Sequence, residues 1–289
     1  MKTGLVLEGG AMRGMFTAGV MDVLMEHGCE FDGVIGVSVG AAFGCNYKSR
    51  QIGRVIRYNK QLAHDWRYCS VRSLITTGDL FGAKFAYHTM PDEIDIFDRA
   101  AYDANPLAFY VVGTDVETGE PIYKRLDNAT DEAYDWIRAS ASMPLCSRIV
   151  RLEGHKVLDG GISDSIPLEW MERNGYKRNL VVLTQPEGYV KDPNSLMPLM
   201  HLLYSRYPAL IKAMRDRHIM YNAQLDYVRN AEDEGRALVI RPPYSLPIGH
   251  VCHDPRVMQQ VYDIGRSTAT GFLAAHPEFR QQFRKGIDL

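Results

Sequence analysis

The stretch Gly36-Val37-Ser38-Val39-Gly40 constrains this chain more than any other part of its sequence. It follows a short apolar run and leads into small residues at 41–42, which is the layout of a strand, a sharp turn and a helix. Gly36 and Gly40 lack the Cβ atom that would clash in so tight a turn. Such a turn lifts the hydroxyl of its central residue out of the backbone, so the stretch predicts a nucleophile elbow with Ser38 as the nucleophile.

A second glycine-rich turn stands near the N-terminus. Residues 3–7 predict a short buried strand, followed by Gly9-Gly10-Ala11-Met12-Arg13-Gly14 and a helix over 15–27. The backbone N–H groups of such a turn and the helix dipole favour negative charge, so a reaction oxyanion would fit there. A phosphate or dinucleotide cradle is disfavoured, because Ala11 replaces a fingerprint glycine and no Gly-Lys-Ser/Thr follows. A turn without any ligand stays open.

The third motif is Val157-Leu158-Asp159-Gly160-Gly161, in which an acidic residue ends an apolar strand. No side chain at Gly160 or Gly161 hinders the approach of another group to the Asp159 carboxylate. This arrangement suits a general base acting on a serine hydroxyl. Asp-Gly is also a common turn signal, and the motif taken alone favours a hairpin or other turn.

In this order, the three motifs resemble the patatin-like phospholipase family, and the resemblance covers roughly residues 3–185. It implies an α/β protein with a three-layer α/β/α fold and a mainly parallel central sheet. It further implies a serine hydrolase of lipid esters that uses a Ser-Asp dyad, with Ser38 as nucleophile and Asp159 as base. The backbone amides around Gly10, Ala11 and Arg13 match the family's oxyanion hole. The segments 138–144 and 164–167 also fit the family pattern, whereas Ala11 departs from it, since many relatives have glycine there.

These assignments predict hydrolysis of carboxylic esters of lipids without a metal or cofactor. A free aspartate, with a pKa of about 3.9, is a weak base near neutral pH, so we expect the apolar neighbours of Asp159 to raise its pKa. One alternative is a protein that binds a lipid or acyl group without turnover. Another is a Ser-His-Asp hydrolase. For it the chain offers five histidines after Asp159, all expected on the surface or on helices: His201, His218, His250, His253 and His276.

Composition limits the remaining possibilities. With 289 residues, 46% hydrophobic content and a formal net charge of −2, the chain predicts a globular protein without the basic surface of a nucleic-acid-binding protein. Its five scattered cysteines suggest neither a disulfide framework nor a zinc site. No signal segment or membrane-spanning run is evident. We therefore expect a cytoplasmic location, with peripheral contact at a membrane surface as an added possibility and the oligomeric state open.

Two regions are predicted along the chain: a hydrolase domain over 1–186 and a mainly helical extension over 187–289 packed on it. Within the first, residues 48–98 are expected to form a cap over the site. Within the second, residues 196–221 predict a basic amphipathic helix, which either lies on an anionic membrane or packs on the domain. Arg13 has two interpretations as well, as a cation for a lipid head group or as a salt-bridge partner of Glu8 or another acidic residue.

Overall fold

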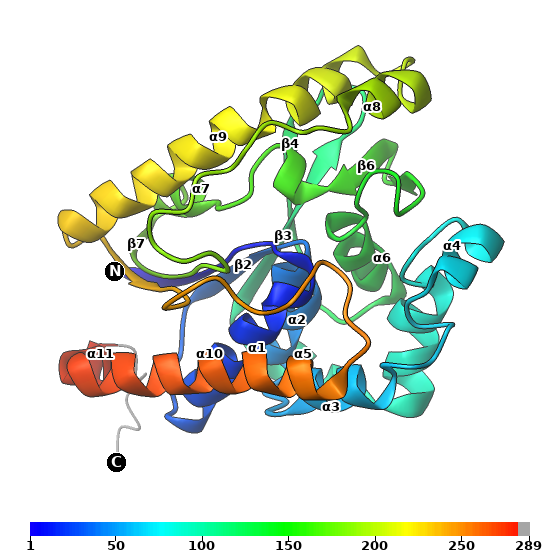
Figure 1. The fold of residues 1–289 in the computed structure, drawn as a ribbon. Helices are drawn as coiled ribbons and strands as arrows, with labels where there is room; N and C mark the ends of the chain where they lie inside the picture. The colour runs from blue at the N-terminus through cyan, green and yellow to red at the C-terminus, as the bar shows by residue number, and fades with distance from the viewer. Residues whose placement is uncertain (283–289) are drawn as a thin grey trace.

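A single eight-stranded sheet forms the centre of the molecule (Figure 1). The computed structural model describes residues 1–282. The strands are β1 (Lys2–Leu7), β2 (Gly33–Val37), β3 (Ala108–Asp115), β4 (Pro121–Arg125), β5 (Val150–Leu152), β6 (His155–Asp159), β7 (Tyr176–Val182) and β8 (Ala237–Ile240). Their order is β5-β6-β3-β2-β1-β7-β8, and β4 pairs with β3 off this path.

The five strands β3, β2, β1, β7 and β8 run parallel, and β4, β5 and β6 add antiparallel pairs at one side. Parallel neighbours need long crossover connections, and helices supply them here. The expected α/β class with a mainly parallel sheet is thus confirmed.

Helices cover both faces of this sheet (Figure 1). The α-helices are α1 (Gly14–Glu26), α2 (Val39–Lys48), α3 (Arg54–Gln61), α4 (Val71–Thr77), α5 (Arg99–Ala104), α6 (Asp131–Ser140), α7 (Leu168–Arg173), α8 (Met197–Leu203), α9 (Pro208–Asp233), α10 (Pro255–Ala275) and α11 (Pro277–Gln282). Two short turns of tighter helix are η1 (Ala11–Arg13) and η3 (Gly160–Ile162), and η2 (Phe85–Ile94) is a wider π-helix.

Alternate residues of the central strands belong to two different cores. Leu5 and Leu7 of β1 are buried with the residues of α1, α2 and α10, whereas Val6 is buried with those of α7 and α9. Because successive side chains of a strand point to opposite faces, a strand covered on both sides reads as a continuous apolar run. This explains why strands of this sheet stand out in the sequence.

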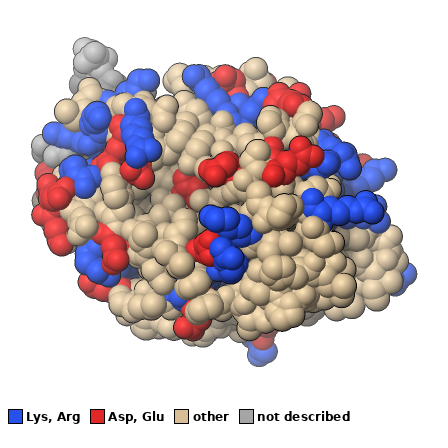
Figure 2. Space-filling view, turned by 90° about the horizontal axis from the view of Figure 1, so that it is seen from above, with Lys and Arg blue, Asp and Glu red and all other residues tan. Residues whose placement is uncertain are grey.

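The segment expected to form one helix over 196–221 is divided in two. α8 ends at Leu203 and α9 begins at Pro208, because proline has no N–H to donate and disfavours helical geometry in the residue before it. α9 buries its apolar side, including Leu210, Ile211 and Met214. Its outward side carries pairs of opposite charge, and both signs of charge are interspersed on the face seen from above (Figure 2).

The last hundred residues are joined to the rest through the sheet and through one long helix. β8 pairs in parallel with β7, which places it at an edge of the sheet. α10 packs along α1, where the Tyr262 hydroxyl donates to Asp22 at 2.6 Å and Arg266 pairs with Glu26 at 2.8 Å. Within residues 1–282, no helix combines the length and apolar character required to span a bilayer.

Candidate active site

Ser38 lies in the sharp turn between β2 and α2, at the carboxyl end of a central strand. Its backbone has φ 55° and ψ −121°, a combination that residues with a side chain rarely adopt. Close packing holds the turn in place. A Cβ atom on Gly36 would lie 2.3 Å from the Gly40 carbonyl oxygen, and one on Gly40 would lie 2.3 Å from that of Leu7. Only glycine fits at either position, and strain of this kind is concentrated at functional sites.

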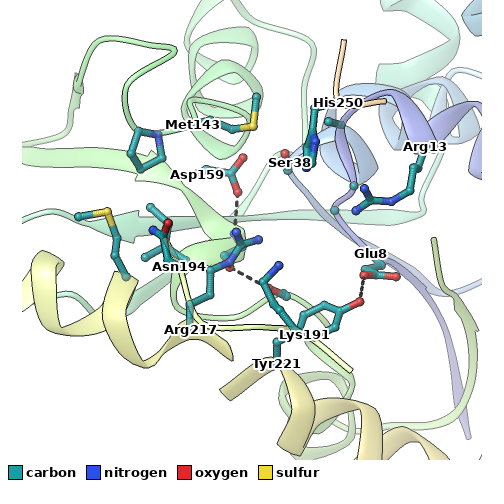
Figure 3. A pocket seen from close by; sticks show the side chains of 18 of the residues that line it. Glu8, Arg13, Ser38, Met143, Asp159, Lys191, Asn194, Arg217, Tyr221 and His250 are labelled. Atoms are coloured by element: carbon teal, nitrogen blue, oxygen red, sulfur yellow. Dashed lines mark hydrogen bonds between the residues drawn. The ribbon is translucent and has the colours of Figure 1, made fainter. Parts of the chain in front are cut away.

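The register of the sheet brings Asp159 close to Ser38. Val37 of β2 is opposite Val112 of β3, so the next residue, Ser38, comes level with Gly113. Gly113 is in turn opposite Asp159 of β6. Because Gly113 is a glycine, no side chain at this position separates Ser38 from Asp159. The two side chains therefore face the same cavity, although residues 38 and 159 are far apart in the sequence (Figure 3).

The Asp159 carboxyl group is 5% exposed and the Ser38 side chain is nearly as buried. Burial raises the pKa of Asp159 above its usual range. Three neighbours lower this pKa in part: the Ser38 hydroxyl, the positive charge of Arg217 and the Gly161 amide. The Gly161 N–H donates a hydrogen bond to Asp159 Oδ1 at 2.8 Å. A carboxylate with a raised pKa is a stronger base, and the hydroxyl that it would deprotonate is near enough to interact with it.

The end of α6 holds both residues in position. The Ser140 hydroxyl accepts a hydrogen bond from the Ser38 backbone N–H at 3.0 Å. The Ser142 carbonyl accepts one from the Asp159 N–H at 2.8 Å. Sequence analysis noted the segment 138–144 only as a supporting pattern. Through these two hydrogen bonds, the segment connects the serine turn and the end of β6 to the end of α6.

The glycine-rich turn after β1 comes close to the serine turn: a Cβ on Gly9 would lie 3.0 Å from the Ser38 Cβ. The Arg13 N–H donates to the Gly10 carbonyl, and the Gly14 N–H donates to carbonyls of η1. These two amides therefore close the turn itself, and the role expected of the Arg13 amide in an oxyanion hole stays a prediction. Among residues 1–282, no acceptor is found for the backbone amides of 9–12.

Ala11 has φ 48°, in the left-handed region that favours glycine. The sequence analysis identified this residue as the departure from the family pattern. The turn thus keeps a backbone conformation suited to glycine despite the alanine side chain. That side chain lines both cavities at the site.

Glu8 and Arg13 do not form the salt bridge that was one interpretation of the sequence. The Glu8 carboxylate accepts hydrogen bonds from the Thr184 N–H and the Tyr221 hydroxyl, each at 2.5 Å. Burial raises the pKa of Glu8, although these bonds and the charge of Arg13 oppose the rise. The Arg13 Nε is buried and has no hydrogen-bond partner among the described residues.

Ser38 lies between two cavities of different character, and Ala11 and Met143 also line both. The larger, of about 190 Å³, has a polar and charged lining that includes Asp159 and several basic side chains (Figure 3). The smaller, of about 100 Å³, has a mainly apolar lining. Its walls come largely from residues 54–97, the region expected to cap the site. These include Tyr58, Tyr68, Phe81, Tyr87, Met90 and Phe97.

Three residues of the larger cavity were not singled out as site residues by the sequence analysis. They are Lys191 in the segment after β7, Arg217 on α9 and His250 before α10. Arg217 Nε donates to the Gly161 carbonyl at 2.5 Å, two residues after Asp159. No motif surrounds any of the three, so only the folded chain reveals that they meet.

A Ser-His-Asp triad needs a histidine bonded to the serine or the aspartate. His250 is exposed at the surface, as expected, and it also lines the larger cavity together with Ser38 (Figure 3). Burial and the nearby cations lower its pKa. Within residues 1–282, no hydrogen bond joins His250 to Ser38 or Asp159. The ring nitrogens of His218, His253 and His276 contact Arg215, Ala63 and Glu278 instead.

Similarity to known proteins identifies the family of this chain. Residues 5–170 match the model of the patatin-like phospholipase family, and residues 207–281 match a domain of unknown function, DUF6363. The chain belongs to the patatin-like phospholipase family. An uncharacterised Escherichia coli protein, YjjU, is 30% identical over 93% of the chain and 76% of its own length.

Other relatives are longer. The lysophospholipase NTE1 of Scheffersomyces stipitis is 23% identical over 92% of the chain, which spans only 17% of that protein. A patatin-like phospholipase domain-containing protein of Caenorhabditis elegans, ZK370.4, is 27% identical over 66% of the chain and 14% of its own length. Among solved structures, VipD from Legionella pneumophila matches with a TM-score of 0.44 and 13% identity, over 95% of the chain and 67% of VipD.

Proposed function

We propose that this member of the patatin-like family is a serine acyl hydrolase that cleaves carboxylic ester bonds of lipids. One observation carries the proposal: Ser38, held in a strained turn, and Asp159, buried with a raised pKa, face one cavity. Membership of the family and the relatives named lysophospholipase support lipid hydrolysis in general.

In the first half of the reaction, Asp159 accepts the Ser38 proton while the hydroxyl oxygen attacks the ester carbonyl carbon. The negative charge that develops on the carbonyl oxygen is stabilised by the backbone amides of the glycine-rich turn. Each such donor contributes about 2.7–4 kcal/mol to transition-state stabilisation in comparable sites. The intermediate expels the alcohol, which takes the proton back from Asp159, and the acyl group stays on Ser38.

In the second half, water attacks the acyl-enzyme and gives one proton to Asp159. Collapse of this intermediate breaks the bond to Ser38, whose oxygen recovers the proton, and the carboxylic acid leaves. The apolar cavity supplies a place for the acyl chain, since burying apolar surface is favourable by roughly 25 cal/mol per Å². The alcohol portion then occupies the larger, polar cavity on the other side of Ser38.

The first experiment tests the nucleophile. Short-chain p-nitrophenyl esters and a fluorophosphonate probe are applied to the wild type, to Ser38→Ala, and to Ser267→Ala, an exposed serine on α10 as matched control. We expect Ser38→Ala to lose at least about 10³-fold in kcat/KM and all labelling, and the control to match the wild type. Full activity of Ser38→Ala would contradict the proposal. An inert wild type that still binds fatty acid would favour the non-catalytic alternative.

A second proposal concerns how such an enzyme meets its substrate. The short helix α8 and the residue before it expose four leucines to solvent: Leu196, Leu199, Leu202 and Leu203. Met200 of the same helix lines the larger cavity. Exposed apolar clusters of this kind mark interaction sites, and a lipid surface fits a hydrolase of lipids. We propose that α8 touches the membrane from which the substrate comes.

A further inference from the structure

Basic side chains from four separate segments face the larger cavity. Arg13 comes from η1, Lys191 from the segment after β7, Arg217 from α9 and His250 from the segment before α10 (Figure 3). All but Arg13 lie outside the residues 5–170 that match the family model. The cluster is therefore built largely by the C-terminal part of this chain.

In the described part of the chain, the three permanently basic residues of this cluster make no direct ion pair. Among residues 1–282, neither Arg13, Lys191 nor Arg217 forms an ion pair with a carboxylate, although most surface arginines do. The Arg13 Nε is buried without a hydrogen-bond partner. Burying polar groups in this way is costly unless a ligand satisfies them.

The positive charges that line this cavity lower one another's pKa values. Burial and the charges of Arg217 and Arg13 lower the pKa of Lys191 to about 8. Glu8 and Asp192 oppose this shift without reversing it. The same three cations lower the pKa of His250.

The two carboxylates that line the cavity are already committed. Glu8 accepts from Thr184 and Tyr221, and Asp159 interacts with Ser38 and Gly161. Neither is free to receive a cationic group of a ligand. Among the described residues, the cavity therefore offers several cations to an anion but no uncommitted carboxylate to an ammonium group.

We infer that Arg13, Lys191, Arg217 and His250 form an anion subsite for a phosphate monoester on the alcohol portion of the ester substrate. The inference rests on the proposed function, because it places the acyl chain in the apolar cavity and the phosphate across Ser38 from it. Such a subsite favours substrates whose alcohol portion is anionic. Substrates with a neutral alcohol portion, or with a zwitterionic one such as a choline phosphate ester, are bound less well.

Three substrates with one acyl chain test this selectivity: an acylglycerol phosphate, the acylglycerol without phosphate, and its choline phosphate ester. We expect kcat/KM to be highest for the phosphate monoester. In Lys191→Met, its advantage over the neutral ester falls about tenfold, because a hydrogen bond to a charged group is lost. Lys191→Arg keeps the advantage, and so does Lys177→Met, an exposed lysine as matched control. Equal or better hydrolysis of either other substrate by the wild type would overturn the inference.

Inhibition by inorganic phosphate tests whether the subsite binds a free phosphate ion or the phosphate group of a lipid substrate. Competitive inhibition of neutral-ester hydrolysis, weakened in Lys191→Met, is expected for the shared subsite. Inhibition without preference for the phosphate monoester would mean that the subsite takes free phosphate only, which overturns the assignment to substrate.

Binding of phosphate to Ser38→Ala, followed by calorimetry, needs no turnover. It therefore distinguishes failure of the subsite from failure of the proposed hydrolase activity. No binding to Ser38→Ala, together with normal neutral-ester hydrolysis by the wild type, would refute the subsite and leave the hydrolase standing. Binding by Ser38→Ala that Lys191→Met weakens in the same background would support the subsite even if the esters tried are not cleaved.

Discussion

Burial removes water from the Asp159 carboxylate, and this is the largest influence on its pKa. The proposed mechanism requires the ionised form, because only a carboxylate can accept the Ser38 proton. As the pH falls through the raised pKa, the base is protonated and kcat/KM should fall tenfold per pH unit. Above that pKa the activity should be level until other groups titrate.

The measurement is kcat/KM for a neutral p-nitrophenyl ester between pH 4 and 9, which avoids the titration of a charged substrate. An acid limb with a pKa above the ordinary 3.9 of aspartate is expected. A profile that stays level down to pH 4 would contradict the part assigned to Asp159.

The same raised pKa has a consequence for stability. Between the unfolded and the folded pKa, the native state binds more protons than the unfolded state, so stability falls as pH rises through this window. At neutral pH the buried Asp159 charge therefore destabilises the fold. Asp159→Asn keeps an oxygen to accept the Gly161 N–H but has no charge to bury.

We expect Asp159→Asn to lose at least about 10³-fold in kcat/KM while its Tm at pH 8 exceeds that of the wild type. The Tm difference should shrink as the pH falls towards 4. Thermal unfolding at several pH values measures it. A mutant less stable than the wild type at pH 8 would show that Asp159 contributes more to the fold than its burial costs.

Single residues divide into those that a local motif could identify and those that it could not. Ser38 and Asp159 were predicted because each stands at a strand end beside glycines, in a recognisable local motif. Lys191 and Arg217 stand in ordinary polar sequence, and their place at the site depends on where β7 and α9 lie. Ala11 shows a third case, since its positive φ contradicts what an alanine alone would predict.

At the scale of elements, the strands were predicted well because burial on both faces makes them continuous apolar runs. The segment 196–221 was harder. Its helical spacing is real, but four residues between Leu203 and Pro208 separate α8 from α9. Of the basic residues in this segment, Arg217 turns inward to Gly161, and Lys212 and Arg215 pair with Asp216. Under the proposed membrane contact, the exposed leucines at α8 are therefore better placed to touch a lipid surface than the basic side chains of α9.

A double substitution tests that contact. Leu202 and Leu203 are 72% and 59% exposed, so Leu202→Ser with Leu203→Ser should leave stability nearly unchanged. We expect it to weaken binding to phosphatidylglycerol vesicles, measured by co-sedimentation, about 30-fold, since each of the two side chains loses roughly 1 kcal/mol of apolar burial. Activity on a water-soluble ester should be retained.

The matched control is Ile52→Ser. Ile52 is 44% exposed and follows the far end of α2, away from the turn that carries Ser38. Equal weakening by the control, or vesicle binding unaffected by the double substitution, would argue against α8 as the point of contact.

At the scale of the whole molecule, two parts of the chain meet at the site. The segment that matches the family supplies the serine, the aspartate and the glycine-rich turn. The later residues supply Lys191, Arg217 and His250, and they also complete the sheet with β8. Sequence patterns could predict that the later part is helical. They could not predict how it docks, because docking depends on contacts between residues more than two hundred positions apart.

The closest of these contacts is the crossing of α1 and α10. A Cβ on Gly265 would lie 2.1 Å from the Phe16 carbonyl oxygen, and one on Gly19 would lie 2.1 Å from the Tyr262 carbonyl oxygen. Backbone atoms cannot move aside as a flexible side chain can, so Gly265→Ala must push the two helices apart. We expect a loss of about 1–3 kcal/mol in the free energy of unfolding, the cost typical of overpacking.

Gly271→Ala on the same helix is the matched control, because nothing lies within 4 Å of its added Cβ. Relief of glycine's conformational entropy should stabilise that variant by roughly 0.5–1 kcal/mol. Urea unfolding of both variants measures the two effects, which have opposite signs for the same chemical change. If Gly265→Ala were as stable as Gly271→Ala, the two helices would not be in backbone contact, and α10 could not hold the later residues against the hydrolase part in the way described.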